Sequence, residues 1–214
     1  MTAVNPPSTL TLSRLGCSKG GRALFRDIDC SLHSGQWLYV TGPNGVGKTS
    51  LLRMLCGLAP VESGAILWNQ QPIGSQREAY LQDLFYLGHL NALQESMTVE
   101  ENLRFCSALA GQCADGAQIQ GLLTRFGLRG RARQLVRHLS QGQKRRVALS
   151  RLLLSRARLW VLDEPYVAMD EGGVRMLADL IASHLDAGGL AVLTSHQKVA
   201  VGEHPAQLLE LCAA

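Results

Sequence analysis

Short apolar runs separated by polar turns give most of the chain an alternating order of strands and helices. Near the start, Thr9–Leu12 and Leu24–Ile28 alternate between apolar and polar side chains, which predicts antiparallel strands. Trp37–Val40 is a continuous apolar run of the kind that forms a buried strand, and Leu51–Cys56 favours a helix that stops at Gly57. A glycine-rich segment joins these last two elements, so the order here is strand, loop, helix.

The same patterns continue towards the end of the chain. Further apolar runs predict strands at Ala65–Trp68, Leu84–Leu87, Leu159–Leu162 and Leu190–Leu193. Helical spacing predicts helices at Thr98–Ala110, Gln118–Phe126, Gln143–Ser155 and Val174–Leu185. This order predicts one α/β domain over residues 1–214. Its core, at about 1–89 and 159–214, has a parallel sheet and an N-terminal antiparallel β region, and a helical subdomain is inserted at about 90–158.

The composition is that of one globular domain. A length of 214 residues leaves no room for two complete enzyme domains, and 46% hydrophobic with 18% charged residues excludes a disordered or fibrous chain. The net charge of +4 is too small to identify a nucleic-acid binder. The six cysteines form no Cys-x-x-Cys pair, and the apolar stretches Leu51–Leu58 and Val147–Leu162 are interrupted by arginines. We therefore expect reduced thiols in a cytoplasmic protein that reaches any membrane through a partner.

Residues 42–49 match the phosphate-binding pattern Gly-x-x-x-x-Gly-Lys-Thr. Glycines let backbone N–H groups close round an anion, and the helix that follows adds the positive end of its dipole. We expect Lys48 to reach the β and γ phosphates, Thr49 to bind Mg²⁺ and Ser50 to contact the α phosphate of ATP. The predicted ATP-binding residues are Gly42, Pro43, Asn44, Gly45, Val46, Gly47, Lys48, Thr49 and Ser50. A chance glycine-rich turn is the alternative, and the strand before it and the helix after it argue against it.

Two carboxylates follow the apolar run Leu159–Leu162, at the end of a strand where open α/β sheets gather ligands. Asp163 is the expected Mg²⁺ partner, directly or through water, and Glu164 is expected to polarise water for attack on the γ phosphate. The alternative is a plain strand-ending turn before Pro165. The phosphate-binding pattern upstream favours the catalytic interpretation.

The segment Leu139–Gln143 resembles the signature of ABC-transporter ATPases, Leu-Ser-Gly-Gly-Gln, with Gln141 in place of the first glycine. The resemblance implies a P-loop NTPase (RecA-like) core of the ABC type. It also implies a homodimer in which Ser140, Gln141, Gly142 and Gln143 face the γ phosphate bound by the other copy. A plain helix N-cap at Ser140 is compatible with that role.

The order of the remaining motifs also matches this family. Asp170 falls at the position of the D-loop, and His196 follows an apolar strand as the family's catalytic switch histidine does. On its own, a histidine after a strand is more often a surface or core residue. Two positions depart from the pattern: His89 stands where the Q-loop normally has glutamine, and Thr11–Leu24 offers no aromatic residue to stack on adenine.

Between Asp115 and Asp163 the chain has eleven basic residues and no acidic one. Nucleic-acid binding is one interpretation, although few aromatic residues and no recognised motif support it. We expect instead that these side chains face nucleotide phosphates, a partner subunit and an anionic membrane surface. The eleven are Arg125, Arg129, Arg131, Arg133, Arg137, Lys144, Arg145, Arg146, Arg151, Arg156 and Arg158.

Within the ABC family, four segments resemble the ATP-binding subunits of the cytochrome c maturation system: Leu152–Pro165, Ser96–Leu103, Thr194–Gln197 and the Gly88-His89 pair. The resemblance implies a peripheral ATPase on the cytoplasmic face of a bacterial inner membrane. Its partners would be a second copy, an integral membrane subunit and, indirectly, a heme chaperone, with no nucleic acid. Three alternatives stay open: an ABC ATPase for another cargo such as a lipid or small solute, a nonmembrane ABC ATPase acting on nucleic acid, and a scaffold that binds nucleotide without turnover.

Overall fold

The computed structural model describes residues 7–195 and 199–212. Its chain divides into two compact units. The core unit comprises Met1–Tyr86, Ala157–Glu164 and Ala178–Ala214, and the helical unit comprises Leu87–Arg156 and Pro165–Leu177. No helix among the described residues is both long enough and apolar enough to span a bilayer.

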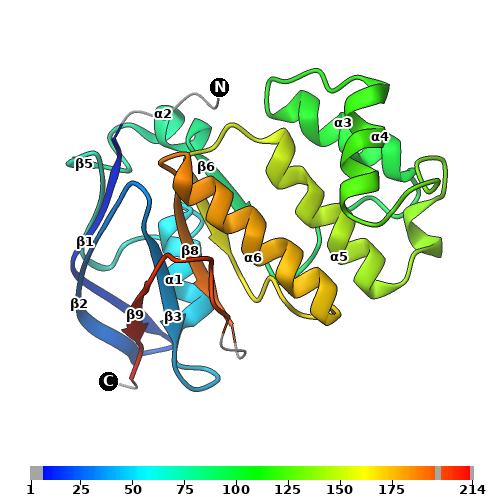
Figure 1. Ribbon diagram of the computed structural model, residues 1–214. Coiled ribbons are helices and arrows are strands. Elements are labelled where there is room, and N and C mark those ends of the chain that lie inside the picture. Colours follow the sequence, from blue (N-terminus) through cyan, green and yellow to red (C-terminus); the bar gives the residue numbers. More distant parts are fainter. Residues whose placement is uncertain (1–6, 196–198, 213–214) are drawn as a thin grey trace. The chain divides into compact units, whose positions relative to one another are not determined.

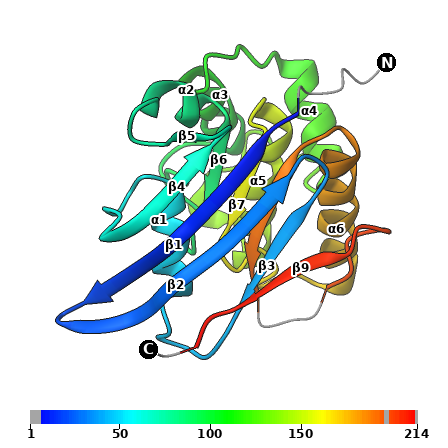
Figure 2. The same cartoon turned by 90° about the vertical axis from the view of Figure 1, so that its left-hand side faces the viewer.

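The antiparallel β region of the core unit is a four-stranded sheet in the order β2-β1-β4-β5 (Figure 2). Its strands are β1 (Thr9–Lys19), β2 (Arg22–His33), β4 (Ser63–Trp68) and β5 (Gln71–Pro72). Leu10 pairs with Leu32 on one side and with Trp68 on the other, and all three side chains are buried. The predicted antiparallel pairing at the N-terminal end is confirmed.

The second sheet of the core unit has the order β6-β7-β8-β3-β9. Its strands are β3 (Trp37–Thr41), β6 (Leu84–Leu87), β7 (Leu159–Leu162), β8 (Leu190–Thr194) and β9 (Ala206–Glu210). β3 is parallel to β8 and β9, and β7 is parallel to β8, which confirms the predicted parallel sheet (Figure 1). The carboxyl ends of β3, β7 and β8 therefore meet at one edge, where Thr41, Leu162 and Thr194 end their strands.

Helix α1 (Lys48–Leu55) directly follows the loop after β3. It buries Leu51, Leu52, Met54 and Leu55 in a hydrophobic cluster to which both sheets contribute. Burial of each such side chain contributes about 2 kcal/mol. The first turn of α1 is thereby fixed at the edge where the parallel strands end.

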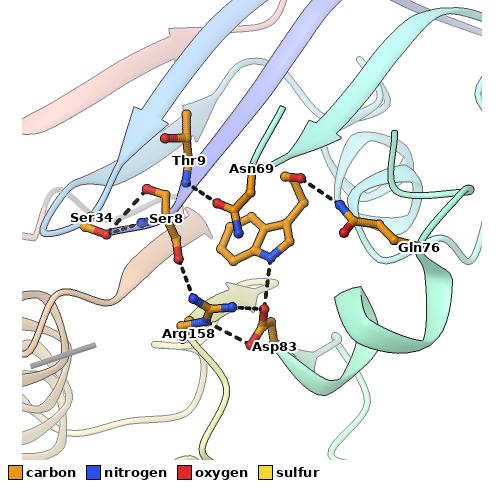
Figure 3. Close-up of polar contacts among 8 residues, drawn as sticks. Ser8, Thr9, Ser34, Asn69, Gln76, Asp83 and Arg158 are labelled. Carbon is orange, nitrogen blue, oxygen red and sulfur yellow. Dashed lines mark hydrogen bonds and ion pairs between the residues drawn. The ribbon is translucent and has the colours of Figure 1, made fainter. Parts of the chain in front are cut away.

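A charged pair at the C-terminal end of helix α2 (Arg77–Gln82) ties distant parts of the core unit together (Figure 3). The Arg158 guanidinium forms a bidentate ion pair with Asp83 and donates to Ser8 Oγ at 2.9 Å. Asp83 also accepts from the indole N–H of Trp68 at 3.0 Å. The pair joins the starts of β1 and β7 to the end of β4.

The helical unit contains α3 (Val99–Leu109), α4 (Gly116–Arg125) and α5 (Gln141–Ser150), with 3-10 turns at Val136–His138 and Arg151–Leu154 (Figure 1). Each of the three helices begins with a capping box. Helix α6 (Glu171–Asp186) starts in this unit and ends in the core unit. The predicted helix Gln143–Ser155 is wrong at both ends. The N-cap Ser140 starts α5 at Gln141, two residues earlier than predicted, and the backbone after Ser150 tightens to a 3-10 turn.

Candidate functional site

The loop between β3 and α1 needs glycine for two separate reasons. Gly42 and Gly47 have φ angles of +135° and +110°, in the left-handed region that favours glycine. At Gly47 a Cβ atom would also lie 3.0 Å from the ring of Phe25 and 3.1 Å from Leu24. Gly47 is also the N-cap of α1, so no N-cap side chain accepts from the first N–H groups of that helix. Those N–H groups suit an anion.

The Lys48 ammonium lies across this loop. It donates to the carbonyl oxygens of Gly42 at 2.7 Å and Pro43 at 3.1 Å. An ammonium has three protons, so two bonds to the loop leave one for a further acceptor such as a phosphate oxygen.

Thr49 and Asp163 are 114 residues apart in the sequence and adjacent in the core unit. The Thr49 hydroxyl donates to Asp163 Oδ2 at 3.0 Å, and Asp163 is only 3% exposed. A hydroxyl and a carboxylate side by side are oxygen ligands of the type that Mg²⁺ prefers, so these residues fit that ion.

Thr194, at the end of β8, completes this group of side chains. Its hydroxyl donates to Asp163 Oδ1 at 2.7 Å and accepts from the Glu164 backbone N–H at 2.9 Å. The sequence pattern gave Thr194 no separate role. The available signal was its place directly after the apolar run Leu190–Leu193, which was predicted to be a strand.

Burial and negative charge shift the pKa values of groups around the two carboxylates. Burial raises the pKa of Cys56 to about 12 and that of Tyr86 to about 12, and the Asp163 carboxylate adds to both shifts. Burial also raises the pKa of Tyr39, with a smaller effect from Glu164, and the Tyr39 hydroxyl donates to the Ser195 carbonyl at 2.9 Å. The negative charge of the two carboxylates favours a cation at this edge of the sheet.

The signature segment lies at the start of α5 in the helical unit. Ser140 Oγ accepts from the Gln143 N–H at 3.2 Å, and Gln143 Oε1 accepts from the Ser140 N–H at 3.0 Å. Gln141 is exposed. A Cβ atom at Gly142 would lie 2.8 Å from the Ala168 carbonyl oxygen, so glycine is needed there for close approach of the backbone.

The other predicted positions have separate surroundings. Asp170 accepts from the Gly173 N–H and pairs with Arg146, and these bonds lower the pKa of its carboxyl group. His89 is exposed and belongs to the helical unit. His196 lies outside the described residues.

Part of the basic segment 125–158 is used inside the protein, which corrects the expectation that all its side chains face phosphates, a partner or a membrane. Arg145 is 4% exposed and donates to Pro165 O, Gly88 O and Asn91 Oδ1 at 3.1–3.3 Å. Lys144, Arg146 and Arg158 pair with Glu95, Asp170 and Asp83, respectively. Burial of a guanidinium requires such partners, and no acidic residue within the segment supplies them, so they come from outside it.

Comparison with known proteins places this geometry in a family. A model of the ABC transporter family matches residues 25–167, more than half of the chain. The chain belongs to the ABC transporter family. It is an ABC ATP-binding domain, and the predicted α/β fold of the P-loop type is confirmed.

Relatives of this ABC ATP-binding domain match it over most of their length. A protein of Albidiferax ferrireducens named cytochrome c biogenesis ATP-binding export protein CcmA is 74% identical over 205 residues, covering 96% of this chain and 98% of its own. The protein of that name from Haemophilus influenzae is 44% identical, covering 89% and 90%. Among solved structures, a putative ABC transporter ATP-binding protein from Pyrococcus furiosus superposes with a TM-score of 0.82 at 25% identity, covering 95% and 97%.

Proposed function

We propose that this ABC ATP-binding domain binds Mg²⁺ and ATP at the edge of its parallel sheet and hydrolyses the bond between the β and γ phosphates. The observation that carries the proposal is the bond between Thr49, in the first turn of α1, and Asp163, at the end of β7. It unites the phosphate-binding loop with the carboxylate that follows β7. Thr49 and Asp163 would hold Mg²⁺, which when bound neutralises charge on the phosphates.

Lys48, the start of α1 and Glu164 then have roles that their positions support. Lys48 and the first N–H groups of α1 bind phosphate oxygens. Consecutive side chains point in different directions, so the Glu164 carboxylate is separate from that of Asp163. Glu164 acts as the general base that takes a proton from the attacking water. His196 is proposed to contact Glu164 and the γ phosphate.

Two substitutions test this ATPase. Lys48→Ala is expected to weaken ATP binding at least tenfold, because the loop loses its one point charge. Glu164→Gln is expected to keep ATP binding and lower kcat by 100-fold or more, because the amide cannot take a proton from water. Nucleotide binding by calorimetry and phosphate release separate the two effects. Unchanged turnover in Glu164→Gln would contradict the assignment of the base.

The signature segment supports a dimer with two shared sites. Ser140, Gln141, Gly142 and Gln143 begin a helix whose first turn carries no acidic side chain, so its N-terminus suits an anion. We assign these residues to the γ phosphate bound by a second copy, with Asp170 at the dimer contact and His89 near the attacking water.

Mixing two inactive variants tests the sharing of sites. Lys48→Ala lacks a working phosphate-binding loop, and Ser140→Arg blocks the signature segment. A heterodimer of the two has one site with both parts intact, so mixing is expected to restore turnover that neither variant shows alone. The matched control is a preparation that contains Lys48→Ala alone at the same total protein concentration, which should show no turnover. No recovery in mixtures that form dimers would refute a signature that acts across the dimer.

The name of the relative that is 74% identical carries the biological role. We assign this chain to c-type cytochrome biogenesis as the ATPase that drives a heme-handling step. It would act at the cytoplasmic face of a bacterial inner membrane, beside an integral membrane subunit and, through that subunit, a heme chaperone. Deletion of the gene is expected to abolish heme-stained c-type cytochromes. Expression of the wild type should restore them, and expression of Glu164→Gln should not.

Exposed apolar residues of the helical unit support a protein partner there. Leu90, Phe105 and Leu109 are 80%, 53% and 73% exposed, and the last two lie one turn apart on α3. We expect Phe105→Glu with Leu109→Glu to reduce co-purification of the membrane subunit while ATPase turnover of the isolated domain stays unchanged. Equal recovery of that subunit with the double variant would place the contact elsewhere.

A further inference from the structure

The side chain of Thr194 is fully buried where β7 and β8 end side by side. Its single hydroxyl proton is committed to Asp163 Oδ1 at 2.7 Å, so the same oxygen can only accept from the Glu164 N–H, at 2.9 Å. One side chain therefore bonds to both residues that follow β7. Valine has the same shape as threonine and can form neither bond.

The two oxygens of Asp163 receive bonds from different elements. Thr49 in α1 donates to Oδ2, and Thr194 in β8 donates to Oδ1. In the proposed function Thr49 is a ligand of Mg²⁺, so its hydroxyl oxygen serves the ion as well. Thr194 is then a donor whose bond to Asp163 does not depend on the ligand.

The bond to the Glu164 N–H has a separate consequence. Glu164 has a φ angle of +49°, in the left-handed region that a residue with a Cβ atom enters only at a cost. The Thr194 hydroxyl accepts a hydrogen bond from the Glu164 N–H, the bond about which φ is measured begins at that nitrogen, and the hydrogen bond therefore holds this end in place. This bond therefore restrains the backbone from which the Glu164 side chain projects.

We infer that Thr194 is a positioning residue for ATP hydrolysis: its hydroxyl sets the orientation of Asp163 and the backbone conformation of Glu164. This inference rests on the proposed function for its catalytic consequence. The two hydrogen bonds on which it is based, one donated and one accepted by the Thr194 hydroxyl, are present in the protein without ligand.

The test compares Thr194→Val with Thr194→Ser, because valine keeps the shape and serine keeps the hydroxyl. Thr194→Val is expected to lower kcat about 10- to 100-fold, since misplacement of a catalytic group by about 1 Å has that effect. The KM for ATP should change less than threefold, because the phosphate-binding loop is untouched. Thr194→Ser should recover most of the lost turnover. Thr11→Val, on β1, is the matched control and should behave as the wild type.

Amide hydrogen exchange in the nucleotide-free protein supplies a readout that is independent of turnover. The Glu164 amide is expected to exchange at least tenfold faster in Thr194→Val than in the wild type, and Thr194→Ser should restore protection. If Thr194→Val does not fold, Thr194→Ala replaces it in both measurements.

Three results would overturn the inference. They are turnover of Thr194→Val within twofold of the wild type, an unchanged Glu164 amide in that variant, and equal impairment of the valine and serine variants. Failure of the wild type to hydrolyse ATP would refute the proposed function instead. The exchange measurement would still decide whether the Thr194 hydroxyl holds Glu164.

Discussion

His184, in α6, is held as a neutral ring by its surroundings. Its Nε2 lies 3.2 Å from the carbonyl oxygens of Arg158 and Leu190, which can only accept, so Nε2 carries the proton. The ring stacks on Trp160 with centroids 3.7 Å apart and planes 5° from parallel. Burial lowers the pKa of His184 to about 4, although the two carbonyls act in the opposite direction.

This shift predicts a loss of stability in mild acid. Because the folded pKa lies below the unfolded value of about 6.5, folding favours the neutral ring. The contribution is complete above pH 6.5 and is lost as the pH falls from 6.5 towards 4. Between pH 7.5 and 5.0 the linkage relation gives a loss of about 2 kcal/mol in the free energy of unfolding from this one group.

Urea unfolding, followed by tryptophan fluorescence without nucleotide, measures this loss. His184→Gln keeps an N–H donor for the carbonyls and removes the titration. The decrease in unfolding free energy between pH 7.5 and 5.0 should be about 2 kcal/mol smaller in the variant than in the wild type. Other titrating groups cancel in this difference. Equal decreases in the two proteins, or an NMR titration of His184 near pH 6.5, would refute the reasoning.

Two further substitutions test packing and pairing by the same urea assay. Gly142→Ala puts a Cβ atom 2.8 Å from Ala168 O and is expected to destabilise by about 1–3 kcal/mol, whereas Gly172→Ala, whose Cβ meets nothing within 4 Å, should be neutral or stabilising. A neutral result at Gly142 would show that the loop moves freely. Asp83→Asn leaves the half-buried Arg158 without its counter-ion and should cost about 2 kcal/mol, reduced from the value of a fully buried pair by solvent screening. Stability unchanged at both low and high salt would contradict that expectation.

The sequence predicted best the strands of the parallel sheet that consist of continuous apolar runs. The predicted strand Leu159–Leu162 agrees with β7 at both ends, and Trp37–Val40 is one residue shorter than β3. Such runs contain only apolar residues, because both faces of the parallel sheet are covered. β9, Ala206–Glu210, was missed because its side chains are mostly exposed and show no alternation. It forms through backbone bonds that pair it with the edge of β3.

The candidate site shows the same division. The glycines at fixed spacing in residues 42–49 indicated a phosphate-binding loop, and the positive φ angles of Gly42 and Gly47 agree with it. Such spacing is a local signal in the sequence. The bonds that Thr194 makes to Asp163 and Glu164 join residues about 30 positions apart, and nothing in the local pattern signals them. The same holds for Arg145, whose burial depends on carbonyls from two distant loops. Sequence spacing identifies groups that act on a ligand more readily than groups that orient them.

The groups suited to phosphate are divided between the two units, and each set is ordered by bonds within its own unit. In the core unit Lys48 is held by loop carbonyls and Asp163 by two hydroxyls. In the helical unit Ser140 and Gln143 satisfy one another at the start of α5. Local order of this kind reduces the entropy lost on binding, so in the proposed dimer the assembly of the two sets on ATP would mainly require their approach. Turnover in the mixture of Lys48→Ala and Ser140→Arg would show that this approach occurs between copies. A wild type that hydrolyses ATP at a rate independent of protein concentration, with no dimer detectable, would refute the proposed sharing of sites between copies.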